Sequence, residues 1–167
     1  MTKRNGELAA LTERFRALGA KNPVDWASSQ IGEGIPQLHR YLFLRQAWRA
    51  IVSDDDHAWI DANIAATKRD PNAPYAGVGH ALAAMREKGV DDEDIAQLVR
   101  GMQAELLFSF CYLLEDPNFE DADAMGVSWS LVALDEQGEP TGPIPGLHES
   151  VLELDPTGRD MRPKRRP

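Results

Sequence analysis

Apolar residues recur every three or four positions along much of the first 115 residues. Between residues 5 and 20, for example, Leu8, Leu11 and Phe15 fall on one side of a helix. A stripe with this period is typical of an amphipathic helix that buries one face. The same pattern predicts three further helices, over 35–52, 53–70 and 74–88. Residues 23–34 interrupt the pattern with two glycines and are predicted to be a connection.

The longest helical pattern covers residues 92–115. Its second half, from Leu106 to Leu114, is apolar on nearly every side. A helix of this kind is normally buried among other helices, so we expect it to be the central helix of a bundle. Glu105 lies at the edge of this stretch and must be paired or protonated if it is buried, because an isolated buried charge is very costly.

Two arginines on the helical pattern over 35–52, Arg45 and Arg49, are the candidate partners of Glu105. Glu105, Arg45 and Arg49 are therefore candidates for a buried polar group. A structural ion pair is favoured over a catalytic acid, since ion-pair networks also perturb pKa values.

The pattern changes after residue 117. Residues 127–131 alternate with period two, residues 135–138 have the composition of a tight turn, and residues 139–144 would return as a second strand. A β-hairpin is thus predicted over about 127–145. Residues 146–154 fit either a short helix or a strand, and the helix is favoured.

These elements predict a mainly α fold. We expect a five-helix bundle around a long central helix at about 92–115, with a small C-terminal β-hairpin and a short terminal helix. The chain has 167 residues, and a globular chain of that length buries roughly 70% of its unfolded surface. We therefore expect one helical domain over 1–158, followed by a basic mobile tail over 159–167.

Charge is distributed unevenly along the chain, whose formal net charge is −9. Residues 1–50 carry a net charge of +4 and residues 51–114 carry −6. Residues 115–158 carry −11 without a single Lys or Arg, and residues 159–167 carry +4. The acidic balance argues against nucleic acid as a partner, because such binding draws its affinity from phosphate neutralisation.

A region of one sign attracts basic partners over long distances. The acids expected to form such a surface are Glu115, Asp116, Glu120, Asp121, Asp123, Asp135, Glu136 and Glu139. Two alternatives remain: a solvated face that keeps the protein soluble, or a surface on which the basic tail folds back.

The sequence favours a soluble, cytoplasmic protein. No secretory signal opens the sequence, and no apolar run approaches the roughly 20 residues of a bilayer span. Cys111 is the only cysteine, which excludes an intrachain disulfide and any multi-cysteine metal site.

No complete catalytic motif is present. The sequence lacks Gly-x-Ser-x-Gly, a phosphate loop and His-Glu-x-x-His, and no Glu is followed three residues later by His. The run Asp54-Asp55-Asp56-His57 has metal-ligand residue types, but capping and the helix dipole explain acids at a helix start. We therefore expect no metal and no cofactor.

Three functions are consistent with these patterns. The first is a non-enzymatic interaction protein, such as an acidic immunity or antitoxin-type protein or a regulatory binding protein, with a basic protein as partner. The second is a small enzyme with a site between bundle and hairpin, built from Asp54, His57, His80, Glu105 and His148. Convergence of two or more of those side chains in one pocket would favour the enzyme. The third is a structural homodimer formed through aromatic surface near Trp129.

Overall fold

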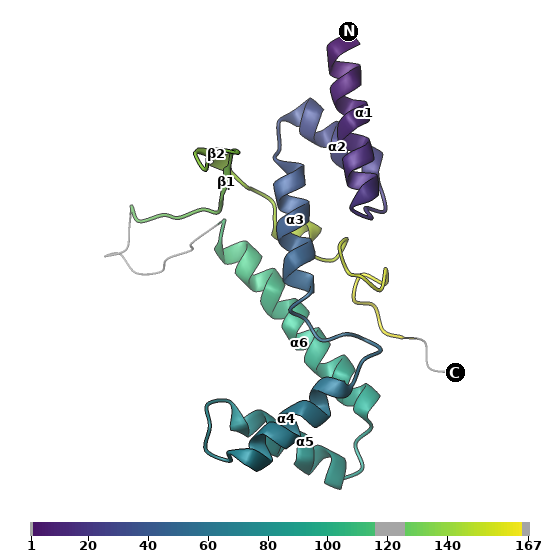
Figure 1. The fold of residues 1–167 in the computed structure, drawn as a ribbon, viewed down its shortest axis with the longest axis vertical. Coiled ribbons are helices and arrows are strands. Elements are labelled where there is room, and N and C mark those ends of the chain that lie inside the picture. Colours follow the sequence, from purple (N-terminus) through teal and green to yellow (C-terminus); the bar gives the residue numbers. More distant parts are fainter. Residues whose placement is uncertain (1, 116–125, 165–167) are drawn as a thin grey trace. The chain divides into compact units, whose positions relative to one another are not determined.

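A computed structural model describes residues 2–115 and 126–164 of the chain (Figure 1). It confirms the mainly helical fold: the described residues form six helices, a two-stranded antiparallel sheet and a 3-10 turn. The helices are α1 (Thr2–Ala17), α2 (Pro23–Glu33), α3 (Gln37–Trp48), α4 (Ala58–Arg69), α5 (Ala76–Glu87) and α6 (Asp92–Leu113). The strands are β1 (Val132–Leu134) and β2 (Pro140–Pro143), and the 3-10 turn is His148–Ser150.

The predicted connection over 23–34 is wrong, because α2 occupies almost all of it. Pro23 stands in the first turn, where its missing N–H is not needed. Gly34 ends the helix in the left-handed conformation with φ +76°, and its N–H donates to the Gln30 carbonyl. The other glycine, Gly32, lies inside the helix. Both glycines are of the residue type that predicts a break, whereas only Gly34 ends the helix.

Helix α4 begins at Ala58, several residues later than predicted. Asp56 accepts a hydrogen bond from the Ala58 N–H at 2.9 Å, so this acid does serve the helix start. Asp54, by contrast, lies well before the helix and is buried. Capping therefore does not account for Asp54.

The prediction that the second half of α6 is buried on all sides is wrong. Five of its large apolar side chains are between 43% and 56% exposed: Leu106, Phe108, Phe110, Tyr112 and Leu113. Within residues 106–114, all of which the structure describes, only Cys111 is fully buried. An apolar sequence shows that a surface can be buried, but not that a neighbouring element covers it.

The hairpin is confirmed, and β2 lies within the predicted second strand over 139–144, whereas the first strand is shifted. The first strand is β1 rather than 127–131, and a β-bulge lies between Ala133 and Leu134. The predicted turn is present, because the Asp135 carboxylate accepts the backbone N–H groups of Gln137 and Glu139. Of the predicted terminal helix over 146–154, only the 3-10 turn forms.

The chain divides into two compact units. Unit 1 contains the described residues up to Gln46 and those from Phe108 to Leu154. Unit 2 contains Ala47–Leu107 and the described residues from Asp155 onward. The chain therefore leaves each unit and returns to it.

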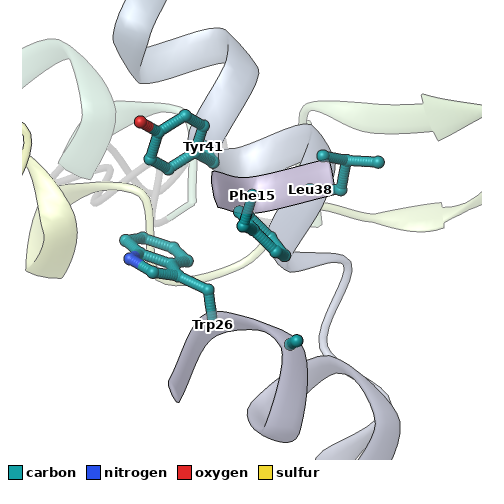
Figure 2. Close-up of a cluster of buried hydrophobic side chains, with 5 residues drawn as sticks. Phe15, Trp26, Leu38 and Tyr41 are labelled. Carbon is teal, nitrogen blue, oxygen red and sulfur yellow. The ribbon is translucent and has the colours of Figure 1, made fainter. Parts of the chain in front are cut away.

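Each unit has its own apolar core. In unit 1, rings from α1, α2 and α3 pack together (Figure 2): Phe15, Trp26 and Tyr41 have centroids 5.4–5.9 Å apart. In unit 2, Ile60, Leu82 and Ile95 bring together α4, α5 and α6. No helix in the described ranges is long and apolar enough to cross a membrane.

Candidate functional site

An apolar groove of about 820 Å³ lies in unit 2, on the surface formed by α4, α5 and α6. Its walls are almost entirely apolar, apart from two amide side chains. The lining residues are Val52, Trp59, Asn63, Val78, Ala81, Leu82, Met85, Ile95, Leu98, Val99, Met102, Gln103 and Leu106. We call this surface the apolar groove.

The spacing of residues on α6 explains one wall of the groove. Ile95, Leu98, Met102 and Leu106 follow one another at three- and four-residue steps, which places them along one side of the helix. Ile95 points into the core of unit 2 and is buried, whereas Met102 is 62% exposed. The groove therefore has a packed floor and an exposed apolar rim.

Two carboxylates flank this rim. Asp94 stands four residues before Leu98, and Glu105 stands three residues after Met102, so both lie beside the apolar row on α6. Both are exposed. The edge of the groove on this helix is therefore acidic.

The carboxylate of Asp54 is the centre of an ion-pair cluster in unit 2. Arg159 Nη2 lies 2.6 Å from Asp54 Oδ2, and Lys164 Nζ lies 3.3 Å from the same oxygen. Gln97 donates to Asp54 Oδ1 at 2.5 Å. Burial by itself would raise the pKa of Asp54, but these hydrogen bonds and positive charges together lower it. Asp54 is therefore held as a carboxylate and has a structural role.

A second buried ion pair joins α6 to the C-terminal segment. Arg100 Nη2 donates to Asp155 Oδ1 at 2.6 Å, and both side chains are almost completely buried. The Arg100 guanidinium also lies over the Trp48 ring, 5.1 Å from its centroid. These contacts fix residues 155–164 to unit 2.

A small polar pocket of about 280 Å³ lies in unit 1. Its lining comes from α2, α3 and the 3-10 region. The lining residues are Asp25, Trp26, Ser29, Gln37, Arg40, Glu149, Ser150 and Glu153. We call it the acidic pocket, because three carboxylates and a single cationic group line it.

The acidic pocket has a firmly built wall. Arg40 Nη2 donates to Glu149 Oε2 at 3.1 Å, and the Arg40 side chain is only 6% exposed. Gly146 has φ +69°, and a Cβ there would lie 2.8 Å from Glu149 Oε2 and 2.6 Å from Arg40 Nη1. A glycine is needed at this position so that the arginine and the glutamate can meet.

The predicted buried group of Glu105, Arg45 and Arg49 does not form. Glu105 and Arg49 are exposed, and Arg45 is half-buried. The reason is that the apolar stretch beside Glu105 is itself exposed, so that its carboxylate stays in water. The buried arginines among the described residues are Arg40 and Arg100, which the sequence reasoning missed.

A signal for Arg100 was present in the sequence. Ala96 and Ala104 stand four residues before and after it on α6, and both are buried. Such small residues leave room for a long side chain lying on the same face of the helix. No comparable signal marks Arg40.

The predicted acidic surface is only partly described. Asp116, Glu120, Asp121 and Asp123 lie outside the described residues. Glu136 and Glu139 are exposed on the hairpin turn, and Asp135 is exposed while its carboxylate accepts hydrogen bonds within that turn.

Glu115 has a different environment. Its Oε1 accepts the Leu147 N–H, and its Oε2 lies 3.2 Å from His148 Nδ1. The nearby Cys111 is buried, and burial together with the charge of Glu115 raises the pKa of its thiol to about 11. Glu115 is therefore engaged inside unit 1, and Cys111 is a poor nucleophile.

No hydrogen bond or ion pair among the described residues joins any two of the five enzyme candidates. Asp54 is occupied by its ion pairs, Glu105 is exposed, and His80 Nε2 lies 3.3 Å from the Pro71 carbonyl. His57 precedes α4 as its N-cap residue, and His148 belongs to unit 1. None of the five lines the apolar groove or the acidic pocket.

No cluster of three or more His, Cys, Asp or Glu side chains within the described ranges is placed to hold a metal ion. Comparison of the chain with protein-family models, with characterised proteins and with solved structures found no match.

Proposed function

We propose that this protein works by binding another protein, and that its apolar groove receives an amphipathic helix of the partner whose polar flank is basic. The observation that carries this proposal is the groove itself. Its apolar walls and its length along α6 suit a helix that inserts residues at three- and four-residue spacing.

The charge of the partner helix follows from the edge of the groove. Asp94 and Glu105 flank the apolar row, so Lys or Arg beside the apolar face of the partner would meet carboxylates there. The exposed Glu136 and Glu139 and the net charge of −9 add attraction for the same class of partner. An acidic immunity-type or regulatory binding protein remains the functional class that we propose.

A pair of designed peptides tests this proposal. One is an amphipathic Leu/Lys helix of about 18 residues, and the other has the same apolar face with Glu in place of Lys. Binding is measured by fluorescence anisotropy of the labelled peptides. We expect the Leu/Lys peptide to bind saturably and the Leu/Glu peptide to bind at least about tenfold more weakly.

Neutral substitutions separate the groove from general charge attraction. The double variant Leu98→Asn with Met102→Gln changes no charge and is expected to weaken binding by about tenfold or more, because truncated apolar anchors dominate such interfaces. The matched control is Leu152→Asn, an exposed leucine in unit 1. Equal binding of the Leu/Lys peptide to the wild type and the double variant would contradict the proposal.

A further inference from the structure

The acidic pocket of unit 1 contains more acceptors than its own residues use. Glu149 is bound to Arg40. Asp25 and Glu153 also line the pocket, and neither forms a hydrogen bond or ion pair with another residue of the described chain. Arg45 and Glu153 both act electrostatically on Tyr41, yet they do not pair with each other. Two exposed carboxylates therefore line the pocket without an ion-pair partner among the described residues, since the one cationic group of the lining, Arg40, pairs with Glu149.

Gln37 gives an independent indication of the missing group. It is only 7% exposed, and its Nε2 donates to Ser29 Oγ at 2.9 Å. Its Oε1 is buried and has no hydrogen-bond partner among the described residues. A buried acceptor without a donor is costly, so a donor brought by a ligand would lower the free energy of this site. Arg40 Nε also lacks a partner, but the excess in the pocket is of acceptors.

Trp26 also borders the pocket, but it is only 6% exposed and its ring packs against Phe15 and Tyr41, so it forms part of the wall and presents no open face. A planar guanidinium carries five N–H donors in a fixed fork and can donate to two carboxylates and an amide oxygen at the same time, whereas an ammonium has only three donors on one nitrogen. The volume of about 280 Å³ admits a guanidinium with a short aliphatic stem, since one water occupies roughly 30 Å³.

From this combination we infer that the acidic pocket binds a guanidinium group, with Asp25 and Glu153 as the anionic partners and Gln37 Oε1 as a further acceptor. The site is separate from the apolar groove, because all its residues belong to unit 1. The guanidinium would come either from an arginine side chain of a protein or from a small free compound, and the two sources offer the same chemistry to the pocket.

An NMR titration of the full chain tests the inference. One arm uses ethylguanidinium chloride, and a second uses a blocked Gly-Arg-Gly peptide, each against sodium chloride at the same ionic strength. We expect saturable shifts at the indole N–H of Trp26 and the side-chain amide of Gln37. Stronger binding of the peptide assigns the site to a protein arginine, whereas binding of ethylguanidinium alone assigns it to a small compound.

Neutral isosteres provide the control. The double variant Asp25→Asn with Glu153→Gln is expected to weaken binding by about tenfold or more, since it removes both unpaired charges. Glu136→Gln with Glu139→Gln removes the same charge from the hairpin turn and is expected to leave binding unchanged. Shifts that do not saturate, that sodium chloride reproduces, or that persist in the folded double variant would overturn the inference.

Discussion

At the scale of single residues, the carboxylate of Asp155 is notable for the number of groups that bind to it. It pairs with the buried Arg100 and accepts hydrogen bonds from Thr157 Oγ1 and from the backbone N–H groups of Thr157 and Met161. Burial would raise the pKa of Asp155, but these hydrogen bonds and the charge of Arg100 together lower it. The carboxylate thus organises the turn that follows it.

Removing this carboxylate should strongly destabilise the protein. Asp155→Ala leaves the Arg100 guanidinium buried without its counter-ion, and we expect a loss of about 3–5 kcal/mol in the free energy of unfolding. Urea unfolding at neutral pH, followed by circular dichroism, measures this loss. Asp160→Asn is the control, because it keeps a residue type that tolerates the φ of +50° at this position. The partner of Asp160, Arg162, is 79% exposed, and such surface pairs contribute about 1 kcal/mol or less. Equal losses in the two variants would show that the buried ion pair contributes no more to the free energy of unfolding than the exposed pair does.

The lowered pKa values of Asp54 and Asp155 also predict an acid limit to stability. The unfolded chain takes up these protons near the ordinary Asp value of about 3.9, whereas the folded chain takes them up only at lower pH. Their contribution is therefore complete above that value and is lost as pH falls through the lowered folded pKa values. Urea midpoints measured at a series of acidic pH values should fall steeply in the wild type. They should fall less steeply in Asp155→Asn, which has no carboxylate to protonate at this position.

Only part of this residue chemistry was accessible from the sequence. The local pattern around Asp54 predicts a helix cap, because its partners Arg159 and Lys164 lie more than a hundred positions further along the chain. Glu105 was chosen because its neighbours are apolar, and it is exposed because they are exposed as well. Pairing between distant charges depends on the fold and leaves no local pattern.

At the scale of elements, the close approach of α4 and α5 rests on one glycine. A Cβ on Gly79 would lie 2.5 Å from the Asn63 carbonyl oxygen and 2.7 Å from Thr67 Cβ, both of which belong to α4. Thr67 Oγ1 donates to the Ala76 carbonyl at 3.0 Å across the same contact. At Gly77, on the same helix, an added Cβ would meet no atom of a neighbouring element within 4 Å.

These two glycines form a matched pair for mutation. Gly79→Ala should lower the free energy of unfolding by about 1–3 kcal/mol, because the added methyl group forces the two helices apart. Gly77→Ala should raise it by about 0.4–1 kcal/mol, since it restricts the unfolded chain without meeting an obstacle. Thermal and urea unfolding of both variants measure the difference. A stabilised Gly79→Ala would show that the crossing is looser than described.

The elements themselves were largely predictable, and the faces they expose were not. The three- to four-residue spacing of apolar residues predicts five of the six described helices. A helix that buries one side has apolar residues at that spacing in its sequence. The five helices are α1, α3, α4, α5 and α6. Helix α2 was missed because Gly32 resembled a breaker. The apolar groove was missed because its residues have the same pattern as a buried face, and only the packing shows that nothing in unit 2 fills it.

At the scale of the whole molecule, fewer of the acidic side chains over 115–158 are available to a partner than the composition of that segment suggests. Three of its described acids are engaged inside their own units: Glu115 with Leu147 and His148, Glu149 with Arg40, and Asp155 with Arg100. The described cations Arg159 and Lys164 form ion pairs with Asp54 instead of with the acids of that segment. Whether the tail over 159–167 is mobile stays a prediction, although these contacts hold its first part.

Truncation after Leu154 tests how far unit 2 depends on the segment that follows. The shortened chain lacks the partners of Arg100 and Asp54, so we expect hydrogen exchange in α4, α5 and the first half of α6 to accelerate strongly. Exchange around the Phe15, Trp26 and Tyr41 cluster should change much less. Arg162→Ala in the full chain is the control and should leave exchange in both units as in the wild type. Uniform acceleration after truncation would contradict independent stabilities of the two units.

The return of the chain to unit 2 also has a consequence for how the protein is made. A ribosome completes the second part of unit 1, residues 108–154, before it reaches Asp155. During that interval Arg100 and Asp54 have already been synthesised, while their counter-ions have not. Unit 2 therefore cannot reach its final state as a nascent chain until the segment over 155–164 has emerged, although its helices come earlier in the sequence. The order of synthesis and the order of completion differ, and a chaperone that shields α4–α6 would act in the interval between them.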